Sequence, residues 1–546
     1  MKKNNHNDYL VKSVFVFTAA TFVLTGCASG SNSLGNAQAE PNEQEKGGDL
    51  TYALASIPSN LDPARSGWAV ETRVYKQIFE GLVTKLPDNT IVPELATDWS
   101  ISDDGKTYTF KLRDDVTFHD GTPFNAEAVQ YSFDRILDPD TQAGNAYSRL
   151  QPYESSTIID DHTIELHLST PSVPFLDNLT QANLTIVSPT AAEEYGDQFG
   201  QHPVGTGPFE FISLQENADI KLKRYEDYDW GSEKYENKGP AYLDSLTFNI
   251  ITEESTRIGS LQSSQVLAAE AIPPQNIETF ELDESLELLS QNIEGLPYTL
   301  FINPDHEPWG ELEARQALQY GIDVDHIVNT LYFGTYDRAW SAITPGLLGY
   351  DESLEGAIEP DVEKAKQLLE NIGWETGADG IRVRDGERLT LKYVDITPNR
   401  EKRNDIAIMI QQQLKELGIE VEIELTKDVA TTIHTNGDYD LYGNSQVNGD
   451  PNALIQFYHS PSEGARDTLS KLNDPKVDEW LQAAVTEKDE EKRADLYKNV
   501  QQYIHDEAII LPIYVPNYTV GTQKSVHDIS FDYLGYPQFN DAYVQP

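Results

Sequence analysis

Hydrophobic and polar residues alternate with a period of two in two stretches of the chain, residues 107–112 and 419–425. This spacing predicts half-buried β-strands, with the apolar side chains on one face. Residues 509–515 are instead almost continuously apolar, which predicts a fully buried strand. All three stretches are short and flanked by turn-forming or polar residues, as strands usually are.

Apolar residues at helical spacing predict four amphipathic helices. Asn125 and Asp361 stand where N-caps are expected, and Gly373 and Gly418 stand where helices commonly end. The predicted helices cover residues 126–137, 362–372, 406–417 and 493–504. The last two are each followed closely by one of the predicted strands. Helices that alternate with strands in this way indicate an α/β architecture.

The first 26 residues have a different pattern, that of a signal peptide. Basic residues precede an apolar run at 14–24, which is too short to cross a bilayer, since about 20 residues are needed. The run ends at Thr25-Gly26-Cys27, which resembles the lipobox of bacterial lipoproteins. That resemblance implies that the chain is cut before Cys27 and that its thiol carries the lipid. The alternative is a free cysteine in an ordinary signal peptide.

Residues 27–47 are small and polar and predict a flexible linker. The folded body therefore begins at residue 48.

Composition excludes several classes of protein. The 546 residues include 40 Lys and Arg against 90 Asp and Glu, a formal net charge of −50, and one cysteine. Such a chain would repel a phosphate backbone, so no nucleic-acid partner is predicted. A single cysteine excludes an internal disulfide and a cysteine-rich metal site. We interpret the acidity as a solvated exterior, suited to saline or alkaline surroundings.

Enzyme motifs are missing from the sequence. There is no Gly-x-Ser-x-Gly, His-Glu-x-x-His, Walker loop or Gly-x-Gly-x-x-Gly after a strand. The glycine-rich residues 204–207 lack the lysine of a phosphate loop, and His162 and His167 would point to opposite faces of a strand. We therefore predict no catalytic residue, no metal ligand and no cofactor.

The segment 94–129, from Glu94-Leu95-Ala96-Thr97-Asp98-Trp99 to Ala126-Glu127-Ala128-Val129, resembles the signature of the family 5 extracellular solute-binding proteins. These are the peptide and nickel receptors of ABC importers. The resemblance continues in order to the end of the chain, through segments 203–209, 228–231, 314–323, 449–451 and 505–507. It covers essentially residues 48–546.

The resemblance implies an α/β, two-lobed periplasmic-binding-protein-like fold of the large class, with an extra subdomain in lobe I and two hinge crossings. Lobe I is expected to span 48–293, lobe II 294–514, and a return to lobe I 515–546. It further implies a monomeric binding receptor that is not an enzyme. The receptor would be held on the extracytoplasmic side of the cell membrane by its lipid, would close its lobes on a small solute and would deliver the solute to permease subunits.

Members of the family bind different solutes. In its peptide receptors, an Asp three residues before the Asp-Pro of the lobe II loop pairs with the peptide ammonium, and this chain has Val447 there. In its nickel receptors, arginines of lobe I hold an anionic chelator. One of those positions falls at Asn183, and for the other only Arg149 is close. We place a peptide or peptide-like solute first and keep a nickel or metal chelate as the alternative.

Candidate ligand-binding residues follow from the same resemblance and from residue type. Aromatic side chains suit the walls of a cleft, and the amide-rich loop can donate and accept without a net charge. The candidates are Trp68, Tyr147, Asn183, Trp340, Asn444, Ser445, Gln446, Val447 and Asn448. Two other classes stay open at this point. One is an exported hydrolase that uses the same cleft, and the other is a receptor that feeds a signalling pathway.

Overall fold

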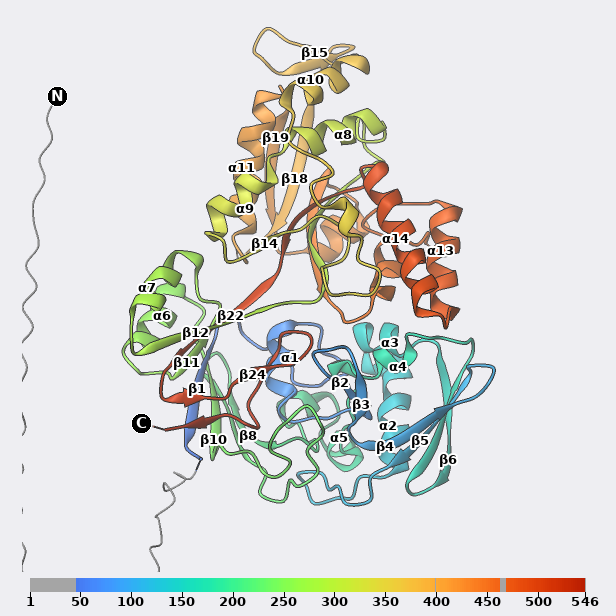
Figure 1. Cartoon of the computed structure of the whole chain (residues 1–546), viewed down its shortest axis with the longest axis vertical. Coiled ribbons are helices and arrows are strands. Elements are labelled where there is room, and N and C mark those ends of the chain that lie inside the picture. The colour runs from blue at the N-terminus through green and yellow to red at the C-terminus, as the bar shows by residue number, and fades with distance from the viewer. Residues whose placement is uncertain (1–45, 398, 462–467, 546) are drawn as a thin grey trace, which may run out of the picture. The chain divides into compact units, whose positions relative to one another are not determined.

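The computed structural model describes residues 46–397, 399–461 and 468–545 (Figure 1). The predicted signal peptide, Cys27 and most of the linker lie outside this range. All of the described residues belong to one compact unit.

A seven-stranded sheet is built from both ends of the described chain. Its central strand β1 pairs in parallel with β10 and β11, and the remaining pairs are antiparallel. In spatial order the strands are β12 (Leu286–Asn292), β22 (Asn517–Gln523), β11 (Ala268–Glu270), β1 (Asp49–Leu54), β10 (Ser245–Ile250), β9 (Asp219–Arg224) and β8 (Phe209–Gln215).

A separate four-stranded antiparallel sheet has its own hydrophobic core. Its strands are β4 (Ala96–Ile101), β5 (Thr107–Leu112), β7 (Thr163–Leu168) and β6 (Tyr153–Asp160). This sheet is the extra subdomain that the family resemblance implies. The alternating residues 107–112 form its strand β5, so that prediction is confirmed.

A six-stranded mixed sheet forms the second half of the protein, with β18 paired in parallel to both β19 and β20. Alternate side chains of β13 enter different cores, with Leu300 on one face and Phe301 on the other. In spatial order the strands are β14 (Asp337–Arg338), β21 (Ile510–Val515), β13 (Gly295–Ile302), β20 (Leu441–Val447), β18 (Thr390–Ile396) and β19 (Glu420–Thr426). The strands predicted at 419–425 and 509–515 are β19 and β21.

The chain passes between the two large sheets twice. The strand β12 ends at Asn292 and β13 begins at Gly295, whereas β21 ends at Val515 and β22 begins at Asn517. We call residues 46–292 with 517–545 lobe I, and residues 295–515 lobe II. The α/β two-lobed fold class predicted from the sequence is confirmed.

Helices cover the sheets. In lobe I they are α1 (Ala69–Tyr75), α2 (Ala126–Leu137), α3 (Gly144–Leu150), α4 (Phe175–Asn178), α5 (Pro189–Tyr195), α6 (Glu254–Gln262) and α7 (Ile277–Leu282). In lobe II, one face of the sheet packs on α8 (Leu312–Gly321), α9 (Val324–Tyr332), α10 (Val362–Asn371) and α11 (Arg403–Glu416). The other face packs on α12 (Ile455–Tyr458), α13 (Pro475–Thr486) and α14 (Glu490–Asp506).

Two of the predicted N-caps have the expected geometry. The Asn125 side chain accepts a hydrogen bond from the amide of Ala128 at 3.0 Å, and Asp361 accepts one from Lys364 at 2.9 Å. Each bond satisfies an amide that the first helical turn leaves free.

A buried acidic cluster lies in lobe I. The carboxylate of Glu80 accepts hydrogen bonds from Tyr228 (2.8 Å), Trp230 (2.9 Å) and Thr206 (3.0 Å). Burial, with a contribution from the nearby charge of Glu94, raises the pKa of Glu80 to about 7. Glu80 is therefore a buried carboxyl group that titrates near neutrality.

We expect the stability of the protein to fall as the pH rises from 4.5 to about 7, because folded Glu80 keeps a proton that the unfolded chain releases. The slope from one such group is about 1.4 kcal/mol per pH unit at most, and it levels off above pH 7. Urea unfolding of the wild type and of Glu80→Gln across this interval measures the difference. Identical slopes for the two proteins would contradict the prediction.

Candidate functional site

A charged centre lies at the carboxyl ends of the parallel strands of lobe I, where Glu270 is the last residue of β11. Its carboxylate accepts from the amide of Ala55 (2.8 Å) and from the hydroxyl of Tyr518 (2.5 Å). Arg73 of α1 forms an ion pair with it at 3.4 Å and stacks on the Tyr518 ring at 4.4 Å. Burial raises the pKa of Tyr518, so its hydroxyl stays protonated and donates a hydrogen bond to Glu270. Sheets of this kind commonly bind ligands at this edge.

A second centre lies in lobe II, at the start of α11. Arg403 donates to Glu401 (2.6 Å), Ser445 (2.9 Å) and Tyr514 (3.1 Å). Burial alone would raise the pKa of Glu401, but the charges of Arg403 and Arg400 lower it to about 2. Glu401 is therefore ionised and opposite in charge to Arg403.

The backbone is strained at this second centre. Glu401 and Lys402 have φ angles of 52° and 55°, in the left-handed region that side chains other than glycine rarely adopt. Such strain persists only where surrounding contacts hold it, and it is common at functional sites.

Tyr336 of lobe II lies beside the second centre. Its ring stacks on Tyr332 with centroids 4.4 Å apart and lies 5.2 Å from the ring of Tyr514. The next residue, Asp337, accepts a hydrogen bond from Asn292 of lobe I at 3.0 Å. Tyr336 is therefore next to a contact between the two lobes.

The end of β20 and the loop that follows it, residues 447–450, contact lobe I directly. Lys85 of lobe I donates to the carbonyl oxygen of Gly449 at 2.9 Å and pairs with Asp177 at 2.6 Å. Val447 packs on the apolar cluster of Tyr533, Leu534 and Tyr536. We call this set of contacts the interlobe contact.

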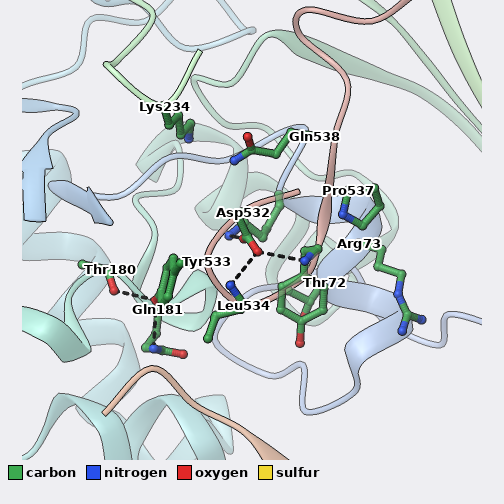
Figure 2. A network of polar contacts seen from close by, with 12 residues as sticks. Thr72, Arg73, Thr180, Gln181, Lys234, Asp532, Tyr533, Leu534, Pro537 and Gln538 are labelled. Atoms are coloured by element: carbon green, nitrogen blue, oxygen red, sulfur yellow. Dashed lines mark hydrogen bonds and ion pairs between the residues drawn. The ribbon is translucent and has the colours of Figure 1, made fainter. Parts of the chain in front are cut away.

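Polar contacts hold the lobe I side of the interlobe contact, as Figure 2 shows. The hydroxyl of Tyr533 hydrogen-bonds Thr180 at 2.7 Å and accepts from Gln181 at 3.0 Å. Asp532 accepts from the amide of Leu534 at 2.9 Å and pairs with Lys76. The Tyr533 ring is therefore fixed against the loop of lobe II.

The lobe II side is also braced. Asp450 forms an ion pair with Arg493 of α14 at 2.7 Å and accepts from the amide of Asn452 at 2.7 Å. Both charged side chains are 8% exposed, so the pair holds the loop in place from within lobe II.

The structure separates the predicted site residues into several places. Trp68 and Tyr147 of lobe I are 58% and 47% exposed. Asn183 is buried, donates to the backbone of residues 63 and 66, and accepts from Arg149 at 2.5 Å. Arg149 also reaches the carbonyl oxygen of Val447 across the lobes at 3.5 Å. Asn183 and Arg149 therefore adjoin the interlobe contact.

Trp340 lies elsewhere in lobe II. It stacks on Arg338 at 4.5 Å and lines a cavity of about 50 Å³ with His505, among side chains of lobe II alone. These contacts of Trp340 do not include a residue of either charged centre.

The residues of the predicted amide-rich loop also differ in their contacts. Ser445 accepts from Arg403, whereas Gln446 donates to Gln456 within lobe II at 2.9 Å. Asn444 lines a small cavity beside Phe457, and Asn448 accepts from the amide of Asp450 at 3.0 Å. Ser445 is thus the member of Asn444–Asn448 that touches a charged centre.

Sequence reasoning missed Arg73, Glu270, Glu401 and Arg403. The last two directly precede the helix predicted at 406–417, but the strand before them, β18, was not predicted, so the sequence did not mark this position as a strand-to-helix turn. Arg73 and Glu270 are 197 residues apart in the sequence. They meet because β11 pairs in parallel with β1, the strand that precedes α1 in the chain.

Two features are absent from the described part of the chain. It contains no group of three or more His, Cys, Asp or Glu side chains placed to hold a metal ion. Nor does it contain a helix that is both long and apolar enough to cross a membrane.

Residues 90–466 match the family model described as bacterial extracellular solute-binding proteins, family 5 middle. The chain therefore belongs to this family of extracytoplasmic binding proteins, and it is a solute-binding receptor of an ABC importer. The resemblance recognised in the sequence is confirmed.

Individual relatives have different solutes. The chain is 28% identical to di/tripeptide-binding protein 1 of Pseudomonas aeruginosa over 91% of its own length and 94% of the relative's. It is similar to the solved structure of DppA from Helicobacter pylori in complex with the peptide STSA, with a TM-score of 0.77, 25% identity, and coverage of 92% and 99%. NikA from Brucella suis in complex with Fe(III)-EDTA shares the fold, with a TM-score of 0.80, 23% identity, and coverage of 91% and 100%.

Proposed function

We propose that this protein captures a peptide or peptide-like solute between its lobes and presents it to the membrane permease. It would act as a monomer, anchored on the extracytoplasmic side of the membrane by a lipid on Cys27. The observation that carries the choice of solute is the presence of one charged centre in each lobe, Arg73 with Glu270 in lobe I and Arg403 with Glu401 in lobe II.

Centres of mixed charge suit a peptide-like solute, which has carboxylate, amide and often ammonium groups. The hydroxyls of Tyr518 and Ser445 add neutral polar groups beside these charges. The names of two relatives, a di/tripeptide-binding protein and DppA in complex with a peptide, support the same class. A metal chelate is the competing solute, since NikA in complex with Fe(III)-EDTA shares the fold.

The solute can be identified by native mass spectrometry of the full chain purified from its own host. We expect a bound mass that fragments as a peptide or peptide derivative. A metal-containing species would contradict the peptide proposal and favour the chelate. Turnover of the bound solute by the purified protein would contradict the assignment as a binding receptor.

The lipid anchor has a separate test. We expect the wild type to partition into Triton X-114 and the Cys27→Ser variant to stay in the aqueous phase, because the serine cannot carry a thioether-linked lipid. Equal partitioning of the two proteins would contradict the role of Cys27.

A further inference from the structure

Most buried arginines of this protein have clear structural roles. Arg257, Arg315 and Arg382 each donate three or more hydrogen bonds, and at least two of these go to backbone carbonyl oxygens. A guanidinium removed from water needs such acceptors, because unpaired buried donors cost free energy. These arginines need no ligand.

Arg73 is different. Its side chain is 14% exposed, yet no described residue accepts a hydrogen bond from its guanidinium. Its Nε is buried without a partner, and its ion pair with Glu270 is long, at 3.4 Å. Glu270 already accepts from Ala55 and Tyr518 through its two oxygens. The guanidinium of Arg73 thus has N–H donors for which the described residues provide no acceptor.

The unused donors lie where a solute would bind. Arg73 stands beside Glu270 at the carboxyl end of β11, and Figure 2 shows its guanidinium turned away from Asp532. Its face is stacked on the ring of Tyr518, which fixes the plane of the guanidinium. Tyr518 pairs across the sheet with Gln291, and the next residue, Asn292, donates a hydrogen bond to Asp337 of lobe II at 3.0 Å. The donors therefore lie on the side of lobe I that meets lobe II.

The distribution of charge points to an anion. The chain has 40 basic residues against 90 acidic ones, and its surface as a whole repels anions. Despite this, each charged centre contains an arginine, Arg73 in lobe I and Arg403 in lobe II. A guanidinium group with free donors attracts a carboxylate and can hold it with two parallel hydrogen bonds.

We infer that Arg73 binds a carboxylate of the solute through its free guanidinium donors, and that the solute is an acidic peptide or another carboxylate-bearing molecule. This inference rests on the proposed function for the location of the solute between the lobes. It adds the charge of the solute and the residue in lobe I that selects it.

The first test uses glutarate as the probe and the full chain in detergent. We expect glutarate to raise the unfolding midpoint of the wild type above that in NaCl of equal ionic strength, since it binds the native state. Arg73→Gln should weaken the apparent affinity at least tenfold, the usual effect of losing hydrogen bonds to a charged group. Arg388→Gln, at a 42% exposed arginine of lobe II, is the matched control and should respond as the wild type does.

A glutarate effect of equal size in the wild type and in Arg73→Gln would overturn the inference, and so would the absence of any effect in the wild type. Arg73→Lys distinguishes shape from charge. It keeps the charge but cannot form two parallel bonds, so its affinity should lie between the other two.

The second test compares Ala-Ala-Glu with Ala-Ala-Gln-amide by calorimetry. We expect the acidic tripeptide to bind the wild type at least tenfold more tightly, and Arg73→Gln to lose this preference. A preference that survives in Arg73→Gln would overturn the inference. Failure of both tripeptides to bind, with the glutarate effect intact, would instead contradict the peptide proposal and leave the assignment of Arg73 in place.

Discussion

Gly449→Ala should leave each lobe folded and prevent the lobes from meeting. A Cβ atom at this position would lie 2.4 Å from Cε2 of Tyr533, and that ring is held by Thr180 and Gln181. Overpacking of this kind costs about 1–3 kcal/mol, which corresponds to about fivefold to 150-fold weaker retention of the solute. Native mass spectrometry measures the retained fraction, and small-angle X-ray scattering measures lobe closure.

Gly259→Ala is the matched control, because a Cβ there meets nothing within 4 Å. It lies inside α6 and should stabilise the protein slightly, by up to about 1 kcal/mol, because alanine is the better helix former. If Gly449→Ala retains solute and closes as the wild type does, the interlobe contact has no part in binding.

Lys234→Met should destabilise lobe I by about 3–5 kcal/mol, the usual cost of leaving a buried charge unpaired. Lys234 pairs with Glu94 in the interior, and the two side chains are 9% and 5% exposed. The loss would leave Glu94 buried beside Glu80 with no compensating positive charge. Urea unfolding followed by tryptophan fluorescence measures the change, since Trp230 donates to Glu80 within this cluster.

Two controls accompany this prediction. Lys223→Met removes a lysine that is 53% exposed and pairs with Glu210 at 2.7 Å, so it should cost less than about 1 kcal/mol. Adding Glu94→Gln to Lys234→Met should restore much of the stability, because the amide can still accept from Gly81 without a charge. Equal effects of Lys234→Met and Lys223→Met would contradict the assignment of a buried pair.

The parts of the fold that were predicted from sequence are those that local patterns determine. Residues 107–112 alternate because one face of β5 is buried, and residues 509–515 are apolar because β21 lies inside its sheet. Short strands such as β11 have no such signal. Their existence depends on partners distant in the sequence, which composition and spacing do not reveal.

The site was predicted less well, for physical reasons. Glu270 and Glu401 were two among 90 acidic residues, and their ion pairs with Arg73 and Arg403 form only in the folded chain. Trp340 was chosen by residue type, whereas its stacking on Arg338 among side chains of lobe II depends on tertiary packing. Ser445 was found because the amide-rich segment Asn444–Asn448 could be recognised in the sequence.

The two crossings between the lobes have a consequence for how such proteins diversify. Lobe II is one uninterrupted insertion, and its first and last long strands, β13 and β21, are hydrogen-bonded neighbours, with Tyr298 opposite Tyr514. Its two ends therefore emerge side by side. A recombination event could exchange the whole lobe by joining the chain at two adjacent points. The recipient protein would keep its own lobe I, including Arg73, and acquire a different lobe II.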